Sequence, residues 1–222
     1  MGEKTMEFKL TNTDITAIEN GDGNFINAKG ASYYGKQEYG KAIEYYRLAA
    51  SIGNLQAVSN LGYCYLYGRD IESNLSLALG YFRIASKREC IDASYKLGDI
   101  YGSDKWGIKD TEQSIYYYRL AADQIFNDDW DYVDIINNEM LLRYPSLCFA
   151  LGREMGIGGQ MNTDIELSYQ FLIAAKKGYE IELANGFKLY ESSYQGVLDY
   201  LDKEEYRRLE DKYDVKFTEE LS

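Results

Sequence analysis

Residues 61–85 read LGYCYLYGRDIESNLSLALGYFRIA, and this stretch decides the fold. Gly62 is followed three residues later by Tyr65, and after a polar segment come the small Ala78 and, four residues on, the bulky Phe82. Residues three and four apart lie on the same face of an α-helix. Apolar residues at this spacing are typical of amphipathic helices. The stretch therefore predicts two helices joined by a short turn.

The same arrangement occurs four times along the chain. Each unit has a glycine, then a large residue three positions later, a small residue, a bulky residue four after it, and an alanine three further on. The glycines are Gly30, Gly62, Gly98 and Gly152, and the residues after them are Tyr33, Tyr65, Tyr101 and Met155. The small residues are Ala42, Ala78, Ser114 and Ser168, and the bulky ones are Tyr46, Phe82, Tyr118 and Leu172. The alanines are Ala49, Ala85, Ala121 and Ala175. Agreement at five linked positions predicts four helical hairpins.

The glycines and polar residues also predict how each hairpin is built. A glycine lets two helix backbones approach, and we expect the small residue of the second helix at the closest contact. Three residues stand where an N-cap is needed, four before a small position: Asn74, Asp110 and Asp164. Gly53 and Gly178 are expected to end second helices in a left-handed conformation. Pro145 fits the first turn of a helix, where its missing N–H costs nothing.

These residues resemble a known family, the Sel-one-like repeat, a relative of the tetratricopeptide repeat. The second unit carries Leu61-Gly62, Tyr65, Gly68, Leu77-Ala78, Tyr81 and Ala85. The third carries Leu97-Gly98, Tyr101, Gly107, Asp110, Tyr117 and Ala121-Ala122, and the fourth Leu151-Gly152, Gly156, Gly158, Asp164, Tyr169 and Ala174-Ala175. The first unit, with its shorter turn, looks more like a plain tetratricopeptide repeat. The resemblance implies an all-α fold, a right-handed superhelix of antiparallel helix pairs, and for most members a role in binding other proteins.

The repeats predict a division of the chain into three parts. Residues 1–23 form an N-terminal segment with a short capping helix, residues 24–190 hold four to five repeats, and residues 191–222 form C-terminal capping helices. Gly62 and Gly98 are 36 residues apart, but Gly98 and Gly152 are 54 apart, so about 18 residues are inserted. We place this acidic insertion near residues 123–143.

Composition excludes several classes of function. The chain of 222 residues has 24 Lys and Arg against 36 Asp and Glu, a net charge of −12, which argues against a general nucleic-acid binder and favours a basic partner. Histidine is absent, and three cysteines without C-x-x-C spacing signal neither a zinc site nor a disulfide framework. We expect no cofactor, no metal and no catalytic residue. The start of the chain has no secretory signal pattern and no stretch is long and apolar enough to span a membrane, so a cytoplasmic monomer is expected.

Partner-binding residues are expected in two places. Positions three before, one after and four after each glycine face away from the hairpin partner and should line a concave groove. They are Asn27, Ala31 and Tyr34; Ser59, Tyr63 and Leu66; Tyr95, Asp99 and Gly102; and Phe149, Arg153 and Gly156. Tyrosine and phenylalanine suit such a groove because they offer large contacts at low entropic cost. The alternative is that these side chains pack between neighbouring helices.

The second expected place is the acidic insertion. Asp128, Asp129 and Asp131 surround Trp130, an aromatic anchor ringed by negative charge. The alternative is an ordinary extra helix whose Trp130 and Ile136 pack on the third and fourth units.

Three functions are compatible with these features. The first is a non-enzymatic scaffold or adaptor that binds a protein or peptide, expected to be basic. The second is an immunity protein or inhibitor that neutralises a basic toxin or nuclease. The third and most remote is an enzyme that uses paired carboxylates.

Overall fold

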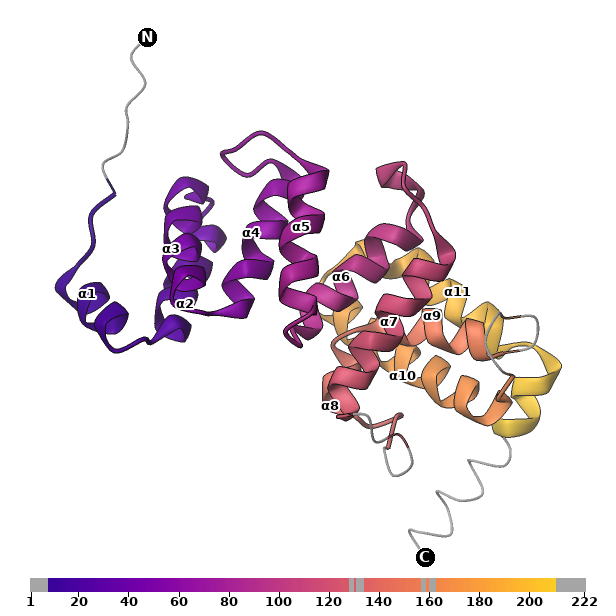
Figure 1. Cartoon of the computed structure of the whole chain (residues 1–222). Helices are drawn as coiled ribbons and strands as arrows, with labels where there is room; N and C mark the ends of the chain where they lie inside the picture. The colour runs from indigo at the N-terminus through magenta and orange to yellow at the C-terminus, as the bar shows by residue number, and fades with distance from the viewer. Residues whose placement is uncertain (1–7, 128–129, 131–133, 157–158, 160–162, 211–222) are drawn as a thin grey trace, which may run out of the picture. The chain divides into compact units, whose positions relative to one another are not determined.

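The computed structural model describes residues 8–127, 130, 134–156, 159 and 163–210 (Figure 1). All regular secondary structure among these residues is helical, as the repeat pattern predicted. The chain divides into two compact units, residues 1–97 and 98–222. Each unit is described by itself.

Unit 1 is a series of helices in which each packs on the next (Figure 1). Its helices are α1 (Asn12–Glu19), α2 (Gly23–Gly35), α3 (Tyr39–Ser51), α4 (Leu55–Tyr67) and α5 (Leu75–Ser86). The helix α6 (Ile91–Gly102) contains the division between the units. The core of unit 1 includes Ile26, Ile43, Tyr46, Leu61 and Cys64, all at most 3% exposed.

The helices of unit 2 vary more in length, from 4 residues in the shortest to 20 in the longest. They are α7 (Thr111–Phe126), α8 (Glu139–Leu142), α9 (Pro145–Met155), α10 (Ile165–Ala184) and α11 (Glu191–Leu201), with short 3₁₀ turns η1 (Asp104–Trp106) and η2 (Lys188–Tyr190). Residues 204–210 are also helical. Here α10 packs on both α9 and α11, and Tyr206 is buried against Tyr169 and Leu172.

The repeat glycine of every hairpin lies against the bulky residue of the second helix. A Cβ atom added to the glycine would lie 2.7 Å from a ring carbon of Tyr46 in the first repeat and 2.8 Å from one of Phe82 in the second. In the third it would lie 2.6 Å from Tyr118, and in the fourth 2.9 Å from Cγ of Leu172. The small residue is also at this contact, as expected: the carbonyl oxygen of Ala42 lies 3.3 Å from the added Cβ in the first repeat, and that of Ser168 lies 3.2 Å away in the fourth. The sequence argument did not predict that the bulky residue fills the remaining space over the glycine.

The small residue has its own role in unit 2. Ser114 donates a hydrogen bond from Oγ to the carbonyl oxygen of Gly98, at 2.8 Å, and Ser168 does the same to Gly152, at 2.6 Å. The corresponding small residues of the first two repeats are alanines, which cannot form this bond. The hydroxyl therefore ties the two helices together only in the unit 2 repeats.

The expected helix ends are mostly present. Asn74, Asp110 and Asp164 each accept a hydrogen bond from the backbone N–H three residues on, which makes them N-caps. Pro145 is the first residue of α9, and Gly53 has a left-handed φ of 94°.

The prediction for Gly178 was wrong, because this residue lies inside α10. A Cβ there would lie 2.7 Å from the carbonyl oxygen of Leu142 and 3.0 Å from Cβ of Pro145. Glycine is therefore needed at this position because another segment of backbone approaches it, and not because the helix ends there.

Pairs of stacked tyrosines recur in three hairpins. Tyr33 stacks on Tyr45 and Tyr65 on Tyr81, with ring centroids 5.4 Å apart in both pairs. Tyr101 stacks on Tyr117 at 5.8 Å. Each pair joins the residue three after the repeat glycine to the residue before the bulky one, so the rings hold the two helices of a hairpin in register.

A buried ionic network fixes α1 to the first hairpin. Asp14 is fully buried, and it accepts hydrogen bonds from Lys29 Nζ at 2.6 Å and from the hydroxyl of Tyr45 at 3.0 Å. Thr11 and Asp14 also form a capping box at the start of α1. Burial alone would raise the pKa of Asp14, but the bonds from Lys29, Thr11 and Tyr45 outweigh it and lower the pKa to about 2. The carboxylate is therefore charged at neutral pH and paired with Lys29.

Candidate functional site

Unit 1 contains a small hollow formed by two predicted groove residues and two others. It is lined by Tyr34 of α2, Tyr46 of α3, and Asn60 and Tyr63 of α4, and has a volume of about 180 Å³. Tyr34 and Tyr63 were expected at a partner-binding groove, and the structure brings them together here. The sequence argument did not identify Tyr46 or Asn60. We call this site the tyrosine hollow.

The hydroxyl of Tyr46 has an unusual environment. The side chain is 97% buried, since only 3% of its surface is exposed, and burial raises the pKa of the phenol well above its ordinary value. It therefore stays protonated and can donate a hydrogen bond. Tyr46 makes no hydrogen bond with any residue that the structure describes, and its hydroxyl oxygen is not enclosed by protein, so the group is open to solvent at the hollow that Tyr46 lines.

Arg69 brings positive charge to Tyr34. Its guanidinium lies 5.0 Å from the ring centroid of Tyr39, 5.8 Å from that of Tyr67 and 6.0 Å from that of Tyr34. Arg69 Nε also donates a hydrogen bond to the hydroxyl of Tyr34, at 3.3 Å. These contacts hold the guanidinium in place by cation–π attraction.

Amide groups and a lysine complete the surroundings. Asn60 donates from Nδ2 to Oδ1 of Asn27, at 2.9 Å, which links α4 to α2 beside the hollow. Lys96 lies over the ring of Tyr63, at 5.4 Å, and over that of Tyr95, at 5.5 Å. Arg69 and Lys96 thus place positive charge against the groove tyrosines of unit 1.

Three residues expected to line an exposed groove are buried instead, and for them the prediction was wrong. Ser59 is fully buried, Leu66 is 4% exposed, and Gly156 is buried. The reason is that α4 packs on both α3 and α5, and α9 packs on α10 and α11, so these positions face neighbouring helices.

The groove residues of unit 2 contact other parts of the same unit. Asp99 accepts a hydrogen bond from the hydroxyl of Tyr118, at 2.7 Å. Phe149 packs edge-to-face on Tyr200, with ring centroids 5.7 Å apart, and the guanidinium of Arg153 lies 5.3 Å from the centre of the Phe149 ring. Phe149 thus contacts the C-terminal helices, which agrees with the packing alternative.

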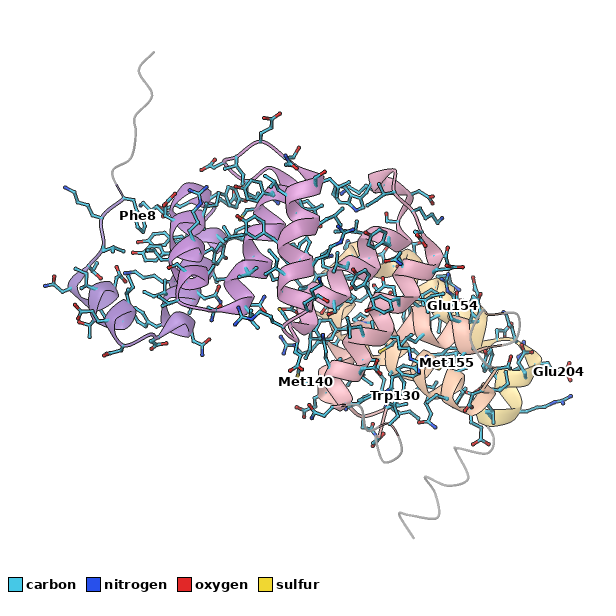
Figure 2. The ribbon with its side chains drawn as sticks, viewed as in Figure 1. Phe8, Trp130, Met140, Glu154, Met155 and Glu204 are labelled. Carbon is cyan, nitrogen blue, oxygen red and sulfur yellow. The ribbon has the colours of Figure 1, made fainter. Side chains whose placement is uncertain are left out.

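The acidic insertion is described only in part. Asp128, Asp129 and Asp131 lie outside the described residues. Figure 2 labels Trp130, which is half-buried and packs edge-to-face on Phe126 of α7 at 4.8 Å, and against Phe171 of α10 at 5.9 Å. Its indole N–H donates to Asp123, at 2.9 Å. For Trp130 the structure therefore favours packing against the repeats over an exposed anchor.

The charge of the protein is divided unequally. Residues 1–97 hold 11 Lys and Arg against 11 Asp and Glu, so unit 1 is neutral. Residues 98–222 hold 13 against 25, so the net charge of unit 2 is −12. The whole net charge of the chain belongs to unit 2.

The acidic and cysteine side chains of the described residues offer little to catalysis or to metal binding. Within the described residues, no three Cys, Asp or Glu side chains are clustered in a way that could hold a metal ion. Cys64, Cys90 and Cys148 are buried, and burial raises the pKa of Cys64 to about 11, which disfavours the reactive thiolate. In the same part of the chain, no helix combines the length and the apolar character needed to cross a bilayer.

A known repeat family matches the four hairpins described above. The profile of the Sel1 repeat matches residues 26–54, 55–90, 91–125 and 145–178. A Sel1 repeat protein from Oxalobacter formigenes is similar in structure, with 24% identity over 50% of this chain and 86% of that chain, and a TM-score of 0.42. A protective antigen of uropathogenic Escherichia coli strains, which displays an SLR fold, is 17% identical over 87% of this chain and has a TM-score of 0.45. The match covers 47% of that antigen. A search of curated proteins found no match. The four matched segments make up more than half of the sequence, and the chain belongs to the Sel1 repeat family.

Proposed function

We propose that this protein is a non-enzymatic scaffold that binds a basic protein through the acidic surface of unit 2. The observation that carries the proposal is the unequal division of charge, with a net charge of −12 on residues 98–222 and none on residues 1–97. Sel1 repeats generally serve as modules for protein–protein interaction, so a protein partner fits the family.

The acidic side chains of unit 2 are available to a partner. Several are exposed and belong to no ion pair within the described residues: Asp110, Glu112, Asp134, Glu139, Asp164, Glu191 and Asp199. A surface of one sign attracts a partner of the opposite sign over distances of about 8 Å at physiological ionic strength. Such steering acts mainly on the rate of association.

Asp134 and Glu139 are the described, exposed acids of the insertion. The three aspartates Asp128, Asp129 and Asp131 belong to the same insertion in the sequence, and we include them in the proposed surface. Unit 1 contributes little to this attraction, because its charges cancel.

The test begins with affinity capture of partners on the full chain, followed by stopped-flow measurement of association for each purified partner. Changing Asp134 to Asn and Glu139 to Gln removes two charges from unit 2. A second variant changes Asp128, Asp129 and Asp131 to Asn. We expect association with a basic partner to slow about threefold or more at low salt for each variant, and to slow in wild type as salt rises.

A matched control removes the same charge from unit 1. Glu19 and Glu72 are exposed, and their change to Gln should leave the association rate within the error of the measurement. Equal slowing in the control and the unit 2 variants, or partners without basic character, would contradict the proposal. If the captured partner is a basic toxin or nuclease whose activity is blocked, the scaffold acts as an immunity protein.

A further inference from the structure

We propose that the tyrosine hollow of unit 1 binds the carboxylate of an Asp or Glu side chain from a partner protein. The hollow lies in the neutral unit and would bind an acidic side chain, whereas the acidic surface of unit 2 would bind a basic partner. The inference therefore does not rest on the proposed function. It is carried by a difference between two repeats of the same chain.

The third repeat shows what the first one lacks. There the hydroxyl of Tyr118 donates to the carboxylate of Asp99, the residue directly after the repeat glycine. Tyr46 is the equivalent tyrosine of the first repeat, and the residue directly after its glycine is Ala31, which has no acceptor. The third repeat thus supplies a carboxylate for its own tyrosine, whereas in the first the tyrosine hydroxyl faces the hollow and has no hydrogen-bond partner among the described residues. A partner's carboxylate would provide the acceptor that Ala31 cannot.

Other donors stand around the same space. The hydroxyl of Tyr34 accepts a bond from Arg69, so its own proton remains available to an acceptor. Arg69 forms no ion pair within the described residues, and its terminal N–H groups can form paired bonds with a carboxylate. Asn60 Nδ2 uses one N–H on Asn27 and has a second to donate.

The charges near the hollow favour an anion. The acid adjacent to Arg69 is Asp70, and its carboxylate accepts the backbone N–H of Gly40, at 2.9 Å. A lysine or arginine of a partner would meet the guanidinium of Arg69 here, whereas a carboxylate would be attracted by it.

The volume also fits a side chain. The volume of about 180 Å³ is enough for one acidic side chain. The expected ligand is therefore one Asp or Glu of an extended segment, with the tyrosine rings covering its apolar atoms.

The experiment uses the full chain and three synthetic peptides of 12 residues, each a Gly-Ser sequence with two Glu, two Gln or two Lys at the same positions. Binding is measured by calorimetry at low salt. We expect the Glu peptide to bind and the other two not to bind. Arg69→Gln should weaken the Glu peptide about tenfold or more, because a hydrogen bond to a charged group is lost.

Two further variants test the comparison between repeats. Ala31→Asp supplies the missing carboxylate from the chain itself, so it should fill the hollow and abolish binding of the Glu peptide. Ala31→Ser is the matched substitution without the charge and should retain binding. Tyr46→Phe removes only the hydroxyl and should weaken binding by about threefold or more.

Arg88→Gln is the control for loss of positive charge, because Arg88 is exposed and, unlike Arg69, does not contact a tyrosine that lines the hollow. It should bind the Glu peptide as wild type does. Equal affinity for the Glu and Gln peptides, preference for the Lys peptide, or equal weakening by Arg69→Gln and Arg88→Gln would overturn the proposal. If circular dichroism shows that Arg69→Gln does not fold, the proposal is tested by Tyr46→Phe and Ala31→Asp, and unchanged binding of the Glu peptide by both would overturn it.

Discussion

The two units share one hairpin design and differ in the residues around it. In both, a repeat glycine lies against a bulky side chain, and stacked tyrosines join the helices. Unit 1 is neutral, and the hydroxyl of Tyr46 has no partner among the described residues, while unit 2 carries a charge of −12 and pairs Tyr118 with Asp99. The difference teaches that the positions that determine the hairpin fold are separate from the positions that determine the surface of each unit. The residue directly after the repeat glycine is one of the positions that determine the surface.

The largest expected effect tests what the units have in common. Gly30→Leu in unit 1 and Gly98→Leu in unit 2 both force a side chain into a ring, since an added Cβ would lie 2.7 Å and 2.6 Å from Tyr46 and Tyr118. Each should lower the free energy of unfolding by about 3 kcal/mol or more, measured by urea denaturation.

Gly80→Ala is the control for this comparison, because a Cβ at Gly80 meets no atom within 4 Å. It should raise the free energy of unfolding by about 0.5 kcal/mol, since alanine favours the helix. An unchanged free energy of unfolding in either Leu variant would show that the glycine is not at a tight helix contact.

The next effect belongs to unit 1 alone. The pKa of Asp14 is lowered to about 2, so its stabilising effect is fully present above about pH 4 and is lost as pH falls towards 2. Asp14→Asn should therefore cost about 2 kcal/mol at pH 6 and close to nothing at pH 2, by urea denaturation at each pH.

Asp22→Asn is the matched substitution, because Asp22 is exposed and caps α2, and Asn caps a helix equally well. It should change stability little at pH 6. A cost for Asp14→Asn that does not depend on pH would assign the stability of α1 to packing and not to the ion pair with Lys29.

The smallest effect belongs to unit 2. Ser114→Ala removes the buried hydrogen bond to the carbonyl oxygen of Gly98 and should cost about 1 kcal/mol in urea denaturation. The reverse change in unit 1, Ala78→Ser, adds a hydroxyl at the position where serine forms this bond in unit 2. A stabilising Ala78→Ser would show that the second repeat can accept the same bond, and that the units differ less than their sequences suggest.

Most of the fold was predictable from the sequence because the repeat constrains it at five positions. Four helical hairpins, three N-caps and the place of Pro145 follow from spacing and capping chemistry alone. The end of α10 was predicted wrongly because a glycine can either end a helix or allow another backbone segment to approach, and the sequence around Gly178 does not distinguish these two roles. The structure does, because the carbonyl oxygen of Leu142 lies against Gly178.

The candidate site was predictable only in part. Tyr34 and Tyr63 followed from the face of the first helices, but Tyr46 belongs to the core pattern, and its position gave no reason to expect an open hydroxyl. One difference in the sequence could have pointed to the site: the residue after the repeat glycine is Ala31 in the first repeat and Asp99 in the third. Its meaning becomes clear only from the structure, in which Tyr118 donates a hydrogen bond to Asp99. Buried groove positions such as Ser59 were misassigned because helix α4 has neighbours on two sides.

The length of α10 has a consequence for how the protein unfolds. The helix runs from Ile165 to Ala184, six residues past the last matched repeat, and packs on both α9 and α11. In a repeat array, units can open one after another from the ends. A helix shared by the fourth repeat and the C-terminal helices prevents this at the C-terminal side, because α11 cannot leave without exposing α10. The amides of α9, α10 and α11 should therefore exchange with solvent as one cooperative group.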